Sequence, residues 1–130
     1  MNPQRRWFRL VPVTLVMGTI FMQSHQSGDS FSLPNISNID KLVHCLVYAV
    51  LGLTAIFALT PQFRQRRPWL ASGVVVLFCL FYGISDEFHQ SFIPGRISSG
   101  ADLAADALGG VVAVVGYWAW RQWSAPGEGA

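Results

Sequence analysis

The sequence predicts an all-α membrane protein, a bundle of four transmembrane helices with both termini in the cytoplasm. Apolar residues make up 52% of the 130-residue chain, and Asp, Glu, Lys and Arg only 12%. A soluble domain carries about a quarter charged residues. The basic residues also alternate between successive connections of the apolar stretches. The length fits a single domain over residues 1–130, and a net charge of +2 is too small to indicate a nucleic-acid partner.

Four apolar stretches predict helices at about residues 7–22, 42–60, 69–88 and 102–120. Crossing the hydrocarbon takes roughly 20 residues at 1.5 Å each, so the later three would span it with their polar ends near the interface. The first contains Pro12, which would kink a membrane helix. The preceding Arg5, Arg6 and Arg9 are also typical of a signal peptide, but no small-x-small cleavage site precedes Gln26, which favours a retained helix.

The positive charges predict the orientation. Seven of the nine basic residues precede the first stretch, separate the second from the third, or follow the fourth: Arg5, Arg6, Arg9, Arg64, Arg66, Arg67 and Arg121. Only Lys41 and Arg96 fall in the other two connections. The positive-inside rule therefore predicts a multi-pass protein of the cell (inner or plasma) membrane with both termini inside. Residues 23–39 are expected to form a flexible or re-entrant outer loop, and the tail 124–130 to be disordered.

The acidic residues and histidines have the opposite distribution, for which orientation rules give no reason. The outer side holds Asp29, Asp40, Asp86, Glu87, Asp102, Asp106, His25, His44 and His89, and the inner side only Glu128. Three helical stripes at spacing i, i+4 result: Asp40, His44 and Tyr48; Asp86 and Gln90; Asp102 and Asp106. Ionised groups in a span usually face a bundle interior or a wet cavity. The second, third and fourth helices are therefore predicted to form an extracytoplasmic polar pocket.

The charge balance of this pocket leaves several interpretations open. Five carboxylates face two cations, so some would be protonated, solvated, paired with histidinium or bound to a divalent metal. No HExxH spacing supports a metal, although histidine with carboxylates suits Zn²⁺ or Mn²⁺. The candidate ligands are His44, His89, Asp86 and Glu87.

A purely structural alternative also accounts for single residues. Asp40 and Asp102 lie near predicted helix N-termini and could cap them, and Arg96 could pair with Asp102 or Glu87. Asp106 resists this explanation because it lies a turn inside an apolar helix, as does the histidine of the second helix. Their joint occurrence on one side favours a site.

Small residues mark one face of the fourth helix. They recur every four residues, at Ala101, Ala105, Gly109 and Ala113. Such a face allows another helix to approach closely, with the carboxylates beside the contact.

Four blocks of sequence follow one another within about residues 40–115: Asp40-Lys41-x-x-His44-x-x-x-Tyr48, the run from Tyr82 to Gln90, Pro94-Gly95-Arg96, and Asp102-Leu103-x-Ala105-Asp106-x-x-Gly109. In this order they resemble the VanZ-like family of small membrane proteins, which is named for a protein that gives resistance to teicoplanin. The resemblance implies a polar pattern at Asp40, Lys41, His44, Glu87, Gln90, Arg96, Asp102 and Asp106. Members often have Asn at the position of Asp106 and an apolar residue at that of Asp86, so this pocket is more acidic.

The predicted function is binding or modification of an envelope amphiphile: a lipid, a lipid-linked precursor or a lipoglycopeptide, as in a glycopeptide-resistance role. Glu87 or Asp106 is the candidate general base and His44 the proton carrier, but the sequence leaves open whether the protein is an enzyme. The candidate ligand-binding residues are Asp40, Lys41, Tyr48, Asp86, Gln90, Arg96 and Asp102. The alternative is a non-enzymatic accessory subunit that docks on a larger membrane protein. Ion conduction is less favoured because the inner halves of the helices lack ionisable residues.

Overall fold

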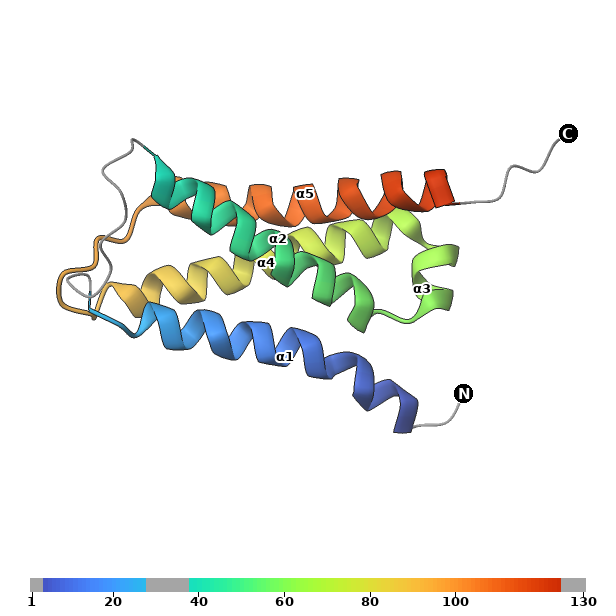
Figure 1. Cartoon of the computed structure of the whole chain (residues 1–130), viewed down its shortest axis with the longest axis horizontal. Helices are drawn as coiled ribbons and strands as arrows, with labels where there is room; N and C mark the ends of the chain where they lie inside the picture. The colour runs from blue at the N-terminus through green and yellow to red at the C-terminus, as the bar shows by residue number, and fades with distance from the viewer. Residues whose placement is uncertain (1–3, 28–37, 125–130) are drawn as a thin grey trace, which may run out of the picture.

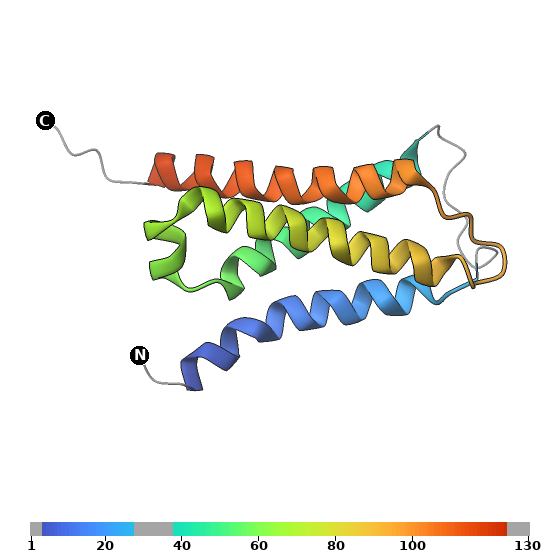
Figure 2. The ribbon, with the colours of Figure 1, turned by 180° about the vertical axis from the view of Figure 1, so that it is seen from behind.

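The computed structural model describes residues 4–27 and 38–124, and all regular structure in these two ranges is helical. The helices are α1 (Gln4–Ser24), α2 (Ile39–Ala58), α3 (Pro61–Arg66), α4 (Pro68–Gln90) and α5 (Gly100–Ser124). The four long helices run along one axis, with α2 and α4 on opposite sides of the bundle (Figures 1 and 2). The start of α1 and the end of α5 lie at the same end as α3 (Figure 1). We call this the arginine end and the opposite end the pocket end.

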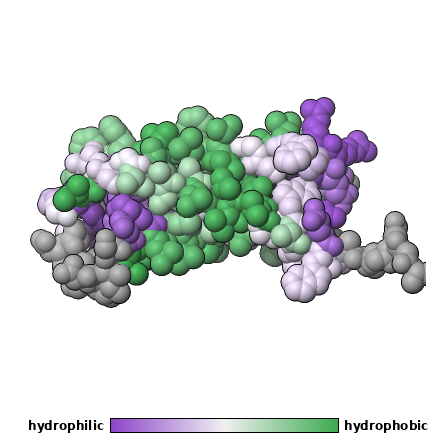
Figure 3. Space-filling view, turned by 90° about the horizontal axis from the view of Figure 1, so that it is seen from above, coloured by the Kyte–Doolittle hydropathy of each residue, from purple (hydrophilic) through white to green (hydrophobic). Residues whose placement is uncertain are grey.

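The helices have the composition of a membrane protein. α2, α4 and α5 are each long and apolar enough to cross a membrane. α1, the first of the four predicted spans, contains Pro12 and packs against α2 and α4. Large apolar side chains such as Leu46, Leu77 and Val115 are more than half exposed. On the face shown in Figure 3, apolar side chains cover the middle and hydrophilic ones gather at the two ends.

The helix boundaries differ from those predicted, mostly by extension. Helices α1, α4 and α5 each reach beyond their apolar stretch at both ends, since polar residues continue a helix past the hydrocarbon that the apolar pattern marks. α2 also begins earlier, but it ends at Ala58 because Thr60 and Pro61 start the unpredicted helix α3. There the Thr60 hydroxyl accepts a hydrogen bond from the Phe63 amide at 3.3 Å. Most of the predicted outer loop (28–37) and of the tail (125–130) lies outside the described residues.

The arginine end also carries a group of aromatic side chains, which the charge pattern did not reveal. All five tryptophans lie near this end, at the start of α1 and of α4 and in the last turns of α5. The guanidinium groups of Arg64 and Arg121 lie 5.3 and 5.9 Å from the ring centroids of Tyr117 and Trp118. Arg9 donates to the Phe57 and Leu59 carbonyls and thereby joins α1 to α2. Tryptophan in this position is typical of the membrane–water interface.

The helices α2 and α5 approach each other through small residues. A Cβ on Gly109 would collide with the Cys45 carbonyl and lie 2.8 Å from the Ala49 nitrogen, and one on Gly52 would lie 2.7 Å from the Ala113 Cβ. Of the predicted small-residue face, positions 105, 109 and 113 are buried, while position 101 is exposed. The close approach predicted from the sequence is therefore made, and its partner is α2.

We expect Gly109→Ala to lower the midpoint of thermal unfolding in detergent, because overpacking a close contact costs about 1–3 kcal/mol. Gly116→Ala is the matched control: it adds the same methyl to the same helix, where nothing lies within 4 Å. The higher helix propensity of alanine over glycine should raise the stability of the Gly116→Ala variant by up to about 1 kcal/mol. Equal midpoints for the two variants would contradict the close contact between α2 and α5.

Candidate functional site

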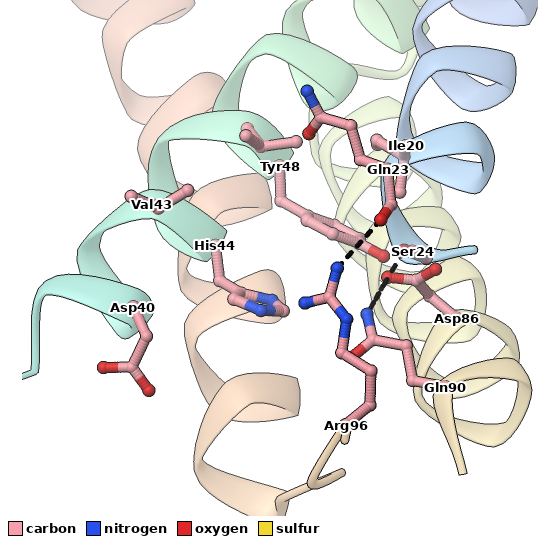
Figure 4. Close-up of a pocket in the computed structure, with 11 residues that line it drawn as sticks. Ile20, Gln23, Ser24, Asp40, Val43, His44, Tyr48, Asp86, Gln90 and Arg96 are labelled. Atoms are coloured by element: carbon pink, nitrogen blue, oxygen red, sulfur yellow. Dashed lines mark hydrogen bonds between the residues drawn. The ribbon is translucent and has the colours of Figure 1, made fainter. Parts of the chain in front are cut away.

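A cavity of about 140 Å³ lies at the pocket end. It is roughly ten times the space that one water molecule needs. The side chains around it come from α1, α2, α4 and the connection that follows α4 (Figure 4). They are Ile20, Gln23, Ser24, Asp40, Val43, His44, Val47, Tyr48, Asp86, Gln90 and Arg96.

The lining differs from the prediction in the helices that supply it. The sequence assigned the pocket to the second, third and fourth predicted spans, the last of which is α5. Instead α1 supplies Ile20, Gln23 and Ser24, while Asp102 and Asp106 of α5 lie outside the lining. The sequence predicts the first apolar stretch only as a span. The local signal for its place at the cavity is the polar pair at the end of that stretch, Gln23 and Ser24.

Asp86 and Gln90 join α4 to α1 on one wall of the cavity. The Gln90 side-chain amide donates to Asp86 Oδ2 at 3.1 Å and lies 3.2 Å from the Ser24 hydroxyl. Nearby, the Tyr82 hydroxyl donates to the Met17 carbonyl at 2.6 Å. The i, i+4 spacing of Asp86 and Gln90 predicted their shared face, and the structure brings both into the cavity.

Arg96 reaches the cavity from the connection between α4 and α5. Its Nη2 donates to the Gln23 carbonyl at 2.8 Å and its Nε to the Gln26 carbonyl at 3.1 Å. These bonds hold the connection against the end of α1. In Figure 4 the guanidinium group points toward the space between His44, Tyr48 and Asp86.

Lys41 joins the start of α2 to the start of α5. Its Nζ lies 2.7 Å from Asp40 Oδ2 and 3.4 Å from Asp102 Oδ1. Neither aspartate is an N-cap, so that structural alternative is wrong. The residue before α2 is Asn38, in a left-handed conformation with φ 64°. The residue before α5 is Ser99, whose hydroxyl accepts from the Asp102 amide at 3.1 Å.

Behind the cavity, three ionisable side chains from three helices meet. His44 Nδ1 of α2 lies 2.9 Å from Asp106 Oδ1 of α5. Glu87 of α4 accepts a hydrogen bond from the Ser99 amide at 2.9 Å through Oε2. One donor atom from each of His44, Glu87 and Asp106 lies within 4.8 Å of the other two. The three candidate catalytic residues are therefore one cluster, and we call it the buried triad.

Several buried oxygens at this end have no hydrogen-bond partner among the described residues. They are the Tyr48 hydroxyl, Glu87 Oε1, Asp102 Oδ1 and Asp106 Oδ2, of which Asp102 Oδ1 still has its ion pair with Lys41. A buried polar atom left unpaired costs about 1–3 kcal/mol. The fold therefore pairs one oxygen of each buried-triad carboxylate and leaves the other unpaired.

The predicted metal ligand His89 lies apart from the buried triad. Its Nε2 is 3.3 Å from His25 Nδ1, and its ring packs at 4.8 Å from that of Phe21. Of the four candidate metal ligands, the structure brings only His44 and Glu87 together, with Asp106 as the third residue. His89 was a candidate because it lies on the same predicted side as the carboxylates, but its ring contacts His25 and Phe21.

A model of the VanZ/LLP1 family matches residues 1–121. The chain belongs to the VanZ/LLP1 family. The match extends beyond the 40–115 range that carries the four sequence blocks and takes in α1, the helix that supplies part of the cavity wall. Comparisons with curated proteins and with solved structures gave no match.

We expect Glu87→Ala to destabilise the bundle by about 1–3 kcal/mol, because the Ser99 amide loses its acceptor at the start of α5. Glu87→Gln is the control, since its side-chain carbonyl can still accept from that amide. The midpoint of thermal unfolding in detergent measures both. If the two variants have the same midpoint of thermal unfolding, the hydrogen bond from the Ser99 amide to Glu87 does not anchor α5.

Proposed function

We propose that this chain binds an anionic amphiphile of the cell envelope, with its head group in the cavity at the pocket end. A membrane lipid, a lipid-linked precursor and a lipoglycopeptide all have this chemistry. The pocket end faces the extracytoplasmic side of the cell membrane in this proposal, and α1 is the fourth span. A glycopeptide-resistance role like that of the family's namesake would be one physiological consequence.

The Tyr48 hydroxyl carries the proposal. Tyr48 is 1% exposed and lines the cavity, yet its hydroxyl has no hydrogen-bond partner among the described residues. A hydroxyl can both donate and accept. Buried polar groups are normally satisfied, so this one is suited to the head group of a ligand.

The remaining lining suits an anionic amphiphile. The guanidinium of Arg96 offers donors in the planar arrangement that matches phosphate and carboxylate. Ile20 of α1 and Val43 and Val47 of α2 form an apolar wall of the same cavity, against which a hydrocarbon chain would lie. Lys41, also a candidate for head-group binding, would act from outside the lining through its pairs with Asp40 and Asp102.

Chemistry on the bound molecule would fall to the buried triad. His44 lines the cavity and is hydrogen-bonded to Asp106, an arrangement suited to carrying a proton between the cavity and the carboxylates. Glu87 or Asp106 would be the general base. Asp86 and Gln90, on the opposite wall, would orient the head group.

A second candidate function is that of a non-enzymatic accessory subunit. The observation that favours it is the internal pairing of the polar network, in which Lys41, His44 and Gln90 each bond a carboxylate of the chain. Such a network stabilises a small bundle without a ligand. This function predicts co-purification of a stoichiometric membrane partner and no specific uptake of an added amphiphile.

We expect Arg96→Gln to weaken binding of a polyprenyl phosphate to the purified protein in nanodiscs by about 10- to 100-fold, because a charge-assisted hydrogen bond is worth roughly 1.5–3 kcal/mol. Tyr48→Phe, which removes one neutral hydrogen bond, should cost several-fold. Arg66→Gln, an exposed residue at the arginine end, is the matched charge control. Phosphatidylcholine is the zwitterionic lipid control. Indistinguishable affinities for Arg96→Gln and Arg66→Gln would refute the assignment of the cavity as the head-group site.

The orientation gives a separate prediction. A green fluorescent protein fused after Ser124 should fluoresce in cells, and an alkaline phosphatase fused there should be inactive. Fusions within the connection between α4 and α5 should give the reverse pattern, because seven of nine basic residues hold the arginine end in the cytoplasm. Active phosphatase after Ser124 would place the pocket end on the cytoplasmic side.

A further inference from the structure

We propose that the buried triad of His44, Glu87 and Asp106 is a binding site for a divalent transition-metal cation, Zn²⁺ or Mn²⁺. The site would lie behind the cavity, with one ligand from each of α2, α4 and α5. Binding of the cation does not depend on the amphiphile. The metal-ligand set differs from the sequence-based one, which held Asp86 and His89 in place of Asp106.

The spacing of the donor atoms fits a single ion after a small adjustment. Metal–ligand bonds of about 2.1 Å place two ligands of a tetrahedral ion about 3.4 Å apart. One donor atom from each residue lies within 4.8 Å of the other two, and the hydrogen bond from His44 Nδ1 to Asp106 Oδ1 already holds the imidazole beside this carboxylate. Glu87 has the longest and most adjustable carboxylate side chain, so rotation of Glu87 would close the site.

The unpaired oxygens provide the second, independent reason. Asp106 is 0% exposed and Glu87 is 9% exposed, and Asp106 Oδ2 and Glu87 Oε1 have no hydrogen-bond partner among the described residues. Two carboxylates in a low-dielectric interior need a positive partner. The ion pairs of Lys41 go to Asp40 and Asp102 instead. A divalent cation would satisfy both oxygens at once.

A glycine on α4 makes room for the aspartate of this site. A Cβ on Gly83 would lie 2.7 Å from Asp106 Oδ2, so this oxygen faces α4 one turn before Glu87. The unpaired oxygen of Asp106 is thus directed toward the helix that supplies the other carboxylate, and not toward lipid.

The donor set selects the class of metal. Imidazole suits Zn²⁺, and carboxylates suit both Zn²⁺ and Mn²⁺. Three protein ligands leave a coordination position open, as in catalytic rather than structural zinc sites. Because His44 also lines the cavity, we expect that open position to face the cavity and the head group of a bound molecule.

The test is metal content. Purified protein in detergent is stripped with a chelator, incubated with zinc chloride or manganese chloride, desalted and analysed by inductively coupled plasma mass spectrometry. We expect about one bound ion per chain and a rise in the midpoint of thermal unfolding on loading. His44→Gln, Glu87→Gln and Asp106→Asn should each lose the ion and the rise. The Glu87→Gln variant retains an acceptor for the Ser99 amide, so its loss of metal would not reflect an unfolded bundle.

Matched controls separate this site from its neighbours. His89→Gln and Asp86→Asn remove the same chemical groups within three residues of Glu87 and should retain the ion. Retention by all three buried-triad variants, or loss by the two controls alone, would overturn the assignment. Absence of metal in the wild type, with an infrared band of a protonated carboxylic acid that Glu87→Gln or Asp106→Asn removes, would also overturn it and show that a proton is shared instead. Arg96→Gln should retain the metal while losing the amphiphile, so the two proposals fail independently.

Discussion

The close approach of α2 and α5 is the constraint on which the rest of the structure depends. Without a side chain on Gly109, the α5 backbone packs directly on that of α2 at Cys45. This contact fixes the depth of one helix against the other. Asp106 lies a turn before Gly109, and His44 is the residue before Cys45. The contact therefore brings Asp106 and His44 opposite each other. A methyl group at the contact would separate the two side chains, so packing of small residues sets the polar geometry.

Because packing sets that geometry, the polar groups are satisfied only in part. In the buried triad each carboxylate bonds through one oxygen, to His44 or to the Ser99 amide, and leaves the other without a partner among the described residues. The structural and functional explanations of these residues are therefore compatible. The hydrogen bonds to His44 and to the Ser99 amide anchor α5. The unpaired oxygen of each carboxylate is available to a proton, a cation or a ligand.

The sequence predicted the helices, and the meeting of their polar side chains at one end, better than it predicted which helices would line the cavity. The helical class, three of the spans and the family were predictable, because apolar length, i, i+4 spacing and ordered motifs are local properties. The role of α1 was not, since the polar pair Gln23 and Ser24 does not by itself reveal that the Ser24 hydroxyl meets Gln90. His89 lies apart from Glu87 for a related reason: a helix turns about 100° per residue, so neighbours in sequence face different partners. The function of the individual site residues stays a prediction.

The depth of the cavity bears on what it can bind. In α2, Tyr48 and His44 lie ten and fourteen residues before Ala58, which is about 15 and 21 Å along the helix axis at 1.5 Å per residue. The hydrocarbon core of a bilayer is about 30 Å thick, and in the proposed orientation the exposed indoles of the arginine end would lie at one interface. With α2 spanning this core, the α2 residues of the cavity, from Asp40 to Tyr48, would lie in the half of the core nearer the pocket end. A purely aqueous solute would have little reason to enter so deep. A molecule whose apolar chain lies beside Val43 and Val47 could offset with that contact the cost of drawing its head group below the surface.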